Sequence, residues 1–295
     1  MTSKFHPRNS RLSLYLKLGK FRLCLLVLFT GMIGYGLGVS EFNLLQCSGF
    51  LIGTLLTALG ANALNQCWER QRDGLMARTR NRPLPTGMLS LFEALTVALM
   101  SSLVGVAILW FLVNPLTSAL GVLTLVTYLL LYTPIKPISP AAVLVGAIPG
   151  AIPPIMGWSA ATNTVSIPAL VLGFVLFLWQ IPHFMALASI YKIDYQKGGY
   201  QLLPDDPAID KVTRSIIVVF SLALLSISLL APAAGLGHSL FLVSALILGG
   251  ALLFLSVQFY RKYSIENARN VFRASIIYLP VLLTILLIDQ RVLIA

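Results

Sequence analysis

Nine runs of about 20 mainly apolar residues follow one another along this chain. A helix needs about 20 such residues to cross the hydrocarbon core of a membrane, because each residue advances it by only about 1.5 Å. We therefore expect an all-α, polytopic membrane bundle of about nine transmembrane helices, which forms one domain over residues 1–295. The expected spans lie near residues 22–40, 44–66, 89–112, 116–133, 140–158, 166–190, 214–234, 239–259 and 273–290.

The charged residues indicate how these helices are oriented. They make up only 11% of the chain, against about 25% in soluble domains, which excludes the soluble class. Basic residues gather on the cytoplasmic side of membrane proteins, so the net charge of +11 predicts orientation rather than nucleic-acid binding. We expect a bacterial cytoplasmic (inner) membrane protein with a basic cytoplasmic arm (1–21) and the C-terminus outside. Every Lys and Arg except Arg291 then falls in that arm, at Arg22 where the first span begins, or in cytoplasmic loops near residues 67–88, 134–139, 191–214 and 260–273.

A cleaved N-terminal segment and a bridging or zinc-binding role for the cysteines are both weaker interpretations. The basic N-terminal segment contains no acid, and the apolar run after it lacks the A-x-A-like end of a cleaved signal peptide. A mitochondrial transit peptide is the alternative, and it is disfavoured because the basic stretch leads directly into a span. Cys24, Cys47 and Cys67 form no CxxC pair, so we expect neither a disulfide framework nor a structural zinc site.

A cluster of charged residues follows the second apolar run, in the segment NQCWERQRDGLMARTRNRPLP (65–85). Asn65, Glu69 and Asp73 stand four residues apart, so on a helix they lie along one face at steps of about 6 Å. Oxygen ligands on one face suit Mg²⁺, which completes its shell with water and substrate phosphates, and the nearby arginines suit a diphosphate. The alternative is a solvated helix end. We favour the metal site, because ionisable groups that continue a membrane span are costly.

The loop after the sixth run, IYKIDYQKGGYQLLPDDP (190–207), contains a second set of acids. Asp194 lies between Lys192 and Lys197, and we expect it to bind a second cation or to share the first. Lys192 is expected to assist in binding the diphosphate. The remaining acids indicate a solvated turn and the start of the next helix: Asp205, Asp206 and Asp210.

Four segments in this order resemble a known family. They are NQCWERQRDGLMARTRNRPLP, YTPIKPISP, GAIPGAIPPIMGW and WQIPHFMALASIYKIDYQKGGYQLLP. Together they are similar to the protohaem IX farnesyltransferases, or haem O synthases, a branch of the UbiA-type intramembrane prenyltransferases. The similarity runs from about Asn65 to Pro204, and the nine-run pattern extends it over the whole chain.

The resemblance implies a Mg²⁺-dependent transferase that moves the farnesyl group of farnesyl diphosphate to a vinyl group of haem b. Water is added, and the products are haem O and diphosphate. The family's helices surround a central cavity that is open to lipid, with the polar site near the cytoplasmic face. Haem b is thus a substrate and not a cofactor. Because the product serves a terminal oxidase, contact with haem A synthase or with oxidase assembly factors is expected.

The resemblance also assigns roles to single residues. The metal-binding and catalytic residues are Asn65, Glu69, Asp73 and Asp194, and the diphosphate-binding residues include Arg78, Arg82 and Lys136. The family often has Lys-Arg after YT, whereas here Pro137 follows Lys136, so one positive charge is missing. Quinone-type relatives usually carry two aspartates four residues apart in the second motif. Gly198 and Ile190 stand at those places here, which favours the haem branch and leaves the second metal site with fewer protein ligands.

His183, in WQIPHF, is a candidate ligand of the haem iron or partner of a haem propionate. Trp179 and Phe184 are candidates for the wall of the haem cavity. The alternatives are a histidine hydrogen-bonded at the break made by Pro182, and aromatic side chains that only pack. The segment GAIPGAIPP (146–154) predicts close helix approach with local breaks rather than chemistry.

Two rival functions remain open. The first is a prenyltransferase of the same superfamily that acts on a quinone precursor or another aromatic acceptor, against which the WQIPHF segment and the single aspartate speak. The second is an ion-coupled transporter with an ion site at the membrane midplane. The acids of this chain cluster at expected cytoplasmic helix ends instead, which disfavours transport.

Overall fold

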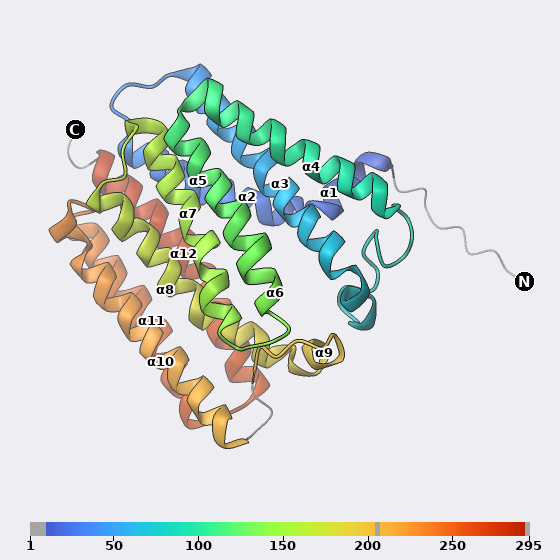
Figure 1. Cartoon of the computed structure of the whole chain (residues 1–295). Helices are drawn as coiled ribbons and strands as arrows, with labels where there is room; N and C mark the ends of the chain where they lie inside the picture. Colours follow the sequence, from blue (N-terminus) through green and yellow to red (C-terminus); the bar gives the residue numbers. More distant parts are fainter. Residues whose placement is uncertain (1–9, 204–206, 293–295) are drawn as a thin grey trace, which may run out of the picture.

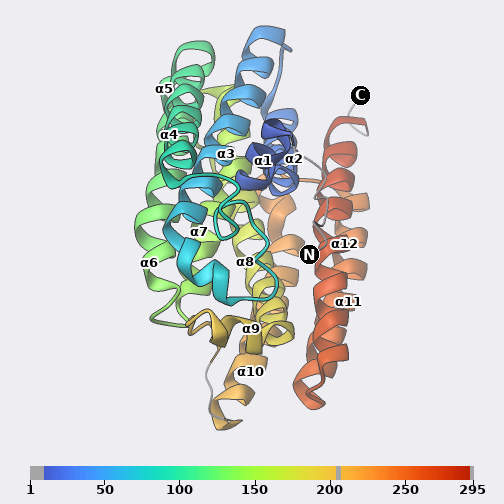
Figure 2. The ribbon, with the colours of Figure 1, turned by 90° about the vertical axis from the view of Figure 1, so that its right-hand side faces the viewer.

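The computed structural model describes residues 10–203 and 207–292 of this chain, with the side chains of 207–210 and 291–292 excepted. It is a bundle of long, roughly aligned helices (Figures 1 and 2). The elements, of which η1 and η2 are π-helical and η3 is a 3₁₀ helix, are α1 (Arg11–Leu18), α2 (Phe21–Gly38), α3 (Leu44–Leu75), α4 (Leu91–Ile108), η1 (Leu109–Val113), α5 (Pro115–Val126), η2 (Thr127–Tyr132), α6 (Thr133–Ile135), α7 (Ala142–Thr162), α8 (Ile167–Ile190), α9 (Lys192–Lys197), α10 (Pro207–Leu230), η3 (Ala231–Ala234), α11 (Ser239–Arg261) and α12 (Ile265–Val292).

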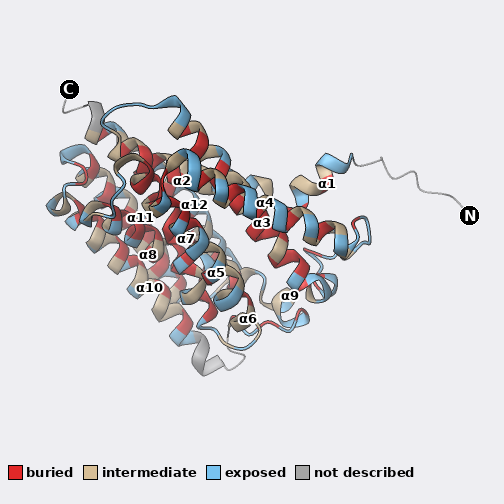
Figure 3. Ribbon diagram, turned by 45° about the horizontal axis from the view of Figure 1, so that its top comes forward, coloured by how far each residue is buried: buried red, intermediate tan, exposed pale blue. Residues whose placement is uncertain are grey.

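The expected all-α membrane fold is confirmed. Within the described ranges, nine helical segments are long and apolar enough to cross a membrane, and the protein is an integral membrane protein. Buried residues gather where helices face one another, while the outward helix faces stay exposed although they are apolar (Figure 3). Phe111, for example, is 80% exposed and Phe254 65% exposed. Such side chains are stable on the surface only if that surface contacts lipid. The expected arm residues 1–9 and the acids Asp205 and Asp206 lie outside the described residues.

Three helices extend further than the hydropathy of the sequence predicts: α10 begins at Pro207 instead of near residue 214, and α3 and α12 extend the most. Helix α3 continues to Leu75 instead of ending near residue 66, and α12 begins at Ile265 instead of near residue 273. Both extensions are polar and lie at the same end of the bundle (Figure 1). The start of α12 is fixed by Ser264, whose hydroxyl accepts the backbone N–H of Asn267 at 3.0 Å, as an N-cap side chain does. An apolar window cannot detect such polar turns.

Helices α2 and α7 pack backbone to backbone, as the small residues of GAIPGAIPP predict. A Cβ on Gly157 would lie 1.8 Å from the carbonyl oxygen of Gly31, and a Cβ on Gly34 would lie 2.0 Å from that of Pro154. Only glycine allows this approach. The predicted local breaks are wrong, because α7 runs as one continuous helix through its internal prolines. The contact therefore forms a rigid pair beside which the other helices are arranged.

One end of the bundle collects the segments that carry the predicted chemistry. The C-terminal part of α3, the turn after it, α6 and α9 lie together there, whereas the connection between α2 and α3 lies at the opposite end (Figures 1 and 2). Just before α6, the chain passes through the π-helical turn η2, and the Thr133 hydroxyl donates to the carbonyl oxygen of Tyr128 at 2.8 Å. A π turn of this kind often accompanies a functional site.

Candidate active site

The three oxygen-bearing residues of α3 share one buried face, as their spacing predicts. Asn65 is 2% exposed, Glu69 4% and Asp73 1%, whereas Trp68 on another face of the same helix is 59% exposed. Two carboxylates buried at a helix end are costly unless they have ionic or hydrogen-bonded partners. Their partners therefore define the site.

Each buried carboxylate faces one base from another segment. Lys136, just after α6, places its Nζ 3.0 Å and 3.3 Å from the two carboxylate oxygens of Glu69. Arg82, in the loop after α3, places its Nη1 2.6 Å from Oδ2 of Asp73. The second oxygen of Asp73, Oδ1, is buried and has no hydrogen-bond partner within the described part of the chain. The structure thus brings Glu69, Asp73, Arg82 and Lys136 together as expected.

The charge state of Lys136 follows from these neighbours. Burial alone would lower the pKa of its ammonium group, but Tyr132 and the Glu69 carboxylate outweigh that effect. They hold the pKa of Lys136 well above its ordinary value. The residue is therefore a permanent cation at neutral pH, suited to an anionic ligand.

Asn65 is held in a defined orientation. Its Nδ2 donates to the Thr133 hydroxyl at 3.0 Å, and because that hydroxyl donates in turn to Tyr128, it can only accept from Asn65. The amide oxygen of Asn65 then points to Nζ of Lys20 at 3.3 Å. An orientation fixed in this way makes the oxygen available as a ligand.

Lys20 is a member of the site that the sequence did not reveal, because it counts there only as one more basic residue before the first span. It lies at the junction of α1 and α2 with a left-handed backbone, φ 51°. Burial, and next to it the charge of Arg82, lower the pKa of Lys20 to about 8, while Glu69 and Asp73 oppose the shift. At pH 7 the ammonium group is thus still mainly charged, and it adds a third cation.

Asp194, expected as a metal ligand, binds backbone in this structure. Its Oδ1 accepts the N–H of Ala77 at 2.7 Å, and its Oδ2 accepts the N–H of Arg78 at 3.2 Å. It thereby fastens the first turn of α9 to the turn that follows α3. In the described ranges, no three His, Cys, Asp or Glu residues come together as a metal cluster. The predicted ligands therefore do not converge on one point, and the ligand role of Asp194 stays a prediction.

Arg78 takes part in the same contact between loops. Its Nη2 donates to the Tyr195 hydroxyl at 3.1 Å, and its guanidinium carbon lies 5.2 Å from the ring centre of Tyr191 and 5.5 Å from that of Tyr195. The guanidinium is exposed and directed at α9. The structure thus does not pair Arg78 with the carboxylates of α3, unlike Arg82.

Arg72 of α3 completes the attachment of the second loop. Its Nη1 donates to the carbonyl oxygens of Gly198 and Gly199 at 3.0 and 2.9 Å. Gly199 has a φ of +69°, and a Cβ there would lie 2.7 Å from the Arg72 guanidinium. Glycine is therefore required at this position by its backbone and by its neighbour.

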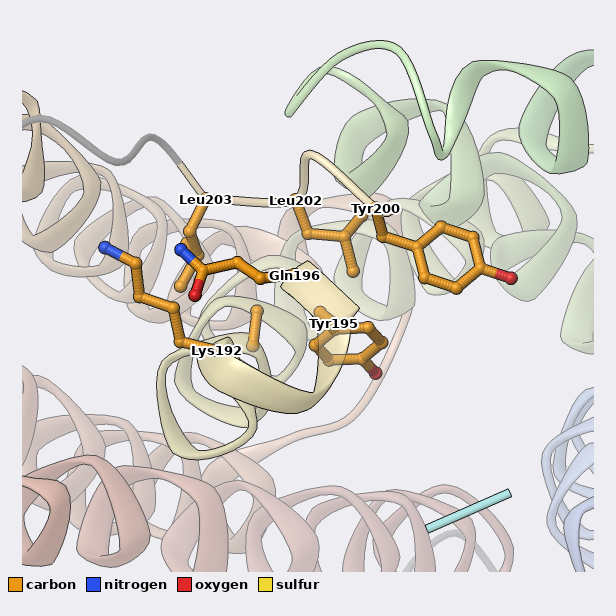
Figure 4. A pocket seen from close by; sticks show the side chains of 7 residues that line it. Lys192, Tyr195, Gln196, Tyr200, Leu202 and Leu203 are labelled. Carbon is orange, nitrogen blue, oxygen red and sulfur yellow. The ribbon is translucent and has the colours of Figure 1, made fainter. Parts of the chain in front are cut away.

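Lys192 lines a small pocket beside α9, as Figure 4 shows. Its side chain and that of Gln196 extend to one side, whereas the ring of Tyr200 extends to the other. Lys192 is thus directed away from the side on which Tyr200 lies, and its contact with a diphosphate stays a prediction.

His183 and Trp179 form a second polar constellation, between α8 and α12. The Trp179 Nε1 donates to the backbone oxygen of Ser275 at 2.7 Å, and its ring stacks on His183 with centres 4.9 Å apart. The Ser275 hydroxyl donates to the backbone oxygen of Phe272 at 2.7 Å, so it must accept from Nδ1 of His183, 2.9 Å away. His183 is then the Nδ1–H tautomer, and its Nε2 keeps a lone pair for a ligand.

The chain can now be compared with known proteins. The model of the UbiA prenyltransferase family matches residues 27–279. This chain belongs to the UbiA prenyltransferase family. A relative named Protoheme IX farnesyltransferase, from Solibacter usitatus, is 39% identical over 287 residues, which cover 94% of this chain and 98% of the relative.

Solved UbiA-fold structures agree with the helical arrangement. A digeranylgeranylglyceryl phosphate synthase superimposes with a TM-score of 0.80 at 17% identity, covering 95% of this chain and 98% of that one. A UbiA homologue from Archaeoglobus fulgidus, bound to GPP and Mg²⁺, gives a TM-score of 0.60 at 14% identity, covering 93% and 99%. At these identities the likeness shows the fold alone, and the chain is a UbiA-family prenyltransferase by its sequence.

Proposed function

We propose that this chain transfers the farnesyl group of farnesyl diphosphate to a vinyl group of haem b. The reaction consumes one water and gives haem O and diphosphate. The choice of haem b as the acceptor rests on the similarity to a Protoheme IX farnesyltransferase over 94% of the chain. The buried carboxylates with their facing bases support the diphosphate half of the reaction.

In this proposal, the bases of the polar end bind the leaving group. Breaking the allylic C–O bond leaves negative charge on the diphosphate, so fixed cations accelerate the step if they face the departing oxygens. Lys20, Arg82 and Lys136 are placed for this purpose, and Arg78 and Lys192 join them if the second loop shifts. The apolar bundle on the other side keeps water from the allylic carbon until the vinyl group attacks.

The α3 face fits a divalent cation. The donors at hand are two carboxylates and an amide oxygen, which are the ligands that Mg²⁺ prefers, and the orphaned Oδ1 of Asp73 lacks a partner that a cation would supply. Asn65, Glu69 and Asp73 would hold the ion. Asp194 would join them if its carboxylate, which accepts the Ala77 and Arg78 N–H groups, also contacted the ion. A bound Mg²⁺ would neutralise charge on the diphosphate.

The His183 constellation supports a haem acceptor. A fixed Nδ1–H tautomer leaves Nε2 as a ligand nitrogen, and its Ser275 partner orients the ring, as a hydrogen-bond partner does for metal-bound histidines. His183 lies seven residues before the end of α8, which is about 10 Å along the helix axis. In this proposal His183 binds the haem iron, and Trp179 forms part of the cavity wall.

The test of this function is conversion of haem b by the purified, full-length protein. With farnesyl diphosphate and Mg²⁺, mass spectrometry of extracted haems should show farnesylated haem, and Asp73→Asn should lower the rate by about a hundredfold or more. The control is Glu93→Gln, which should keep the rate because Glu93 lies in α4 and is paired with Arg11. Prenylation of an aromatic acid in place of haem would contradict the proposal. Turnover that is retained in detergent without any ion gradient would exclude the transporter.

The haem site has its own test. Haem b added to the wild-type protein should shift its Soret band as the iron gains an axial imidazole, and His183→Ala should abolish that shift. His238→Ala is the matched control. It removes another histidine, at the start of α11, which lies at the end of the bundle away from the polar site. A Soret shift that survives in His183→Ala would show that the iron is not bound by this residue.

The cellular setting belongs to the same proposal. We place the protein in a bacterial cytoplasmic (inner) membrane as one prenyltransferase domain, with its N-terminus in the cytoplasm and its C-terminus outside. Haem b and farnesyl diphosphate reach it from the bilayer, and haem A synthase or oxidase assembly factors take the product.

A further inference from the structure

Tyr200 has a buried hydroxyl for which the contacts described so far give no purpose. The residue is 3% exposed, and its hydroxyl oxygen is among the buried polar atoms without a hydrogen-bond partner in the described ranges. A buried donor without a partner is costly. An unsatisfied donor beside a binding site is therefore a candidate contact for the ligand.

Cations surround the ring of Tyr200. The Nζ of Lys136, which also pairs with Glu69, lies 4.3 Å from the ring centre, and the Arg72 guanidinium carbon lies 5.5 Å from it. Glu69 and Asp73 are its acidic neighbours. The ring thus borders the face of α3 at which the diphosphate is proposed to bind, and Figure 4 shows the hydroxyl directed away from α9 and its pocket.

The position of Tyr200 is fixed by the backbone before it. The preceding glycines are held by Arg72, and the N–H of Tyr200 donates to the carbonyl oxygen of Tyr195 at 2.9 Å. These hydrogen bonds fix the segment in place, so the hydroxyl does not need a loop movement to reach the site.

We propose that the Tyr200 phenol donates a hydrogen bond to a diphosphate oxygen of the allylic substrate, an inference that rests on the proposed function. The hydroxyl also interacts with the Glu69 carboxylate, but Glu69 already accepts two contacts from Lys136, so a diphosphate oxygen can replace Glu69 as the acceptor for the phenol. A phenol is protonated at neutral pH, so Tyr200 acts as a donor beside the cations, which supply the charge.

The test is Tyr200→Phe in the full-length protein in detergent, with inorganic diphosphate and farnesyl diphosphate as probes. The variant keeps the ring under Lys136 and removes only the hydroxyl. We expect the Kd of each probe to rise about tenfold, as for a lost hydrogen bond to a charged group. The control is Tyr278→Phe, which removes an equally buried hydroxyl bonded to Ser228 at 3.1 Å on another helix pair, and should leave both Kd values unchanged.

Measurements at higher Mg²⁺ concentration distinguish a direct contact of Tyr200 with the diphosphate from an indirect effect of Tyr200 on the metal ligand Glu69. The tenfold loss in Tyr200→Phe should persist at saturating Mg²⁺. Recovery of affinity at high Mg²⁺, or no loss at all, would overturn the inference. If the wild-type protein fails to farnesylate haem b while Tyr200→Phe still weakens diphosphate binding, the proposed acceptor is wrong and the role of Tyr200 stands.

Discussion

At the scale of single residues, the polar end is a set of charges that balance one another before any substrate arrives. Glu69 pairs with Lys136 and Asp73 with Arg82. Lys20 donates to the amide oxygen of Asn65 at 3.3 Å and forms no ion pair with a carboxylate in the described part of the chain. Ion pairs of this kind lower the cost of burying charge. A diphosphate with a divalent cation would exchange partners with these pairs rather than enter an empty cavity.

Lys20 gives the first residue-scale prediction. Because its ammonium group is not consumed by an ion pair, Lys20→Met should raise the KM for farnesyl diphosphate by about tenfold, as expected for a lost charge-assisted contact. Lys20→Arg should retain most of the affinity, because the guanidinium keeps the charge. Steady-state kinetics at pH 7 measure both.

The control for Lys20 is Lys262→Met, an exposed lysine after α11. It removes the same charge from the same end of the bundle. If Lys262→Met raised the KM as much as Lys20→Met, the effect would come from the general field of the surface and not from Lys20.

At the scale of elements, the two loops that carry the acidic motifs are joined by direct hydrogen bonds. Asp194 holds two backbone N–H groups of the turn after α3, and Arg72 holds two carbonyl oxygens after α9. These bonds cross more than a hundred residues of sequence. The second loop is therefore part of the site even before a cation binds.

Asp194→Asn tests this connection. An amide keeps one acceptor atom, so one of the two N–H groups loses its partner, and the segment near 191–203 should open about tenfold more often. Hydrogen exchange of the backbone amides measures it, and Lys197→Gln, at the exposed end of α9, is the control. Unchanged exchange combined with weaker Mg²⁺ binding would instead assign Asp194 to the metal alone.

The contact between α2 and α7 gives a second prediction about elements. Gly157→Ala places a methyl group 1.8 Å from the Gly31 carbonyl oxygen, so the helices must separate, at a cost of about 1–3 kcal/mol. Gly250→Ala is the matched control within α11, because a Cβ there meets no atom within 4 Å. Thermal unfolding in detergent should show a lower Tm for Gly157→Ala and an equal or higher Tm for Gly250→Ala. Equal Tm values for the two variants would mean that α2 and α7 are far enough apart at Gly157 to accept a methyl group.

Particular residues show how far the sequence determines the structure. The number of spans follows from hydropathy, and the shared face of Asn65, Glu69 and Asp73 follows from helical spacing, because both are local properties. The pairing of Asp194 with the Ala77 and Arg78 amides does not follow, since a carboxylate serves equally well as a metal ligand or as a backbone cap. Lys20 was missed because its role depends on where the first span meets α3, which is a tertiary contact.

At the scale of the whole molecule, the two ends of the bundle differ in charge. The described connections at the end away from the site, namely 39–43, Asn114, 163–166 and 235–238, contain no Lys or Arg. The site end contains the basic loops. This asymmetry supports the proposed orientation with the site at the cytoplasmic face, because basic loops are retained there, where a water-soluble diphosphate product could leave.

Cysteine labelling in intact cells tests this orientation. The three native cysteines are buried, so a single added cysteine reports its own side. Phe42, between α2 and α3, is 68% exposed, and Ile138, between α6 and α7, is 69% exposed, which makes Phe42→Cys and Ile138→Cys a matched pair. A membrane-impermeant maleimide should label Phe42→Cys in intact spheroplasts and Ile138→Cys only after permeabilisation. The reverse pattern would put the diphosphate site outside the cell, where no cytoplasmic allylic diphosphate reaches it, and the proposed reaction would fail with the topology.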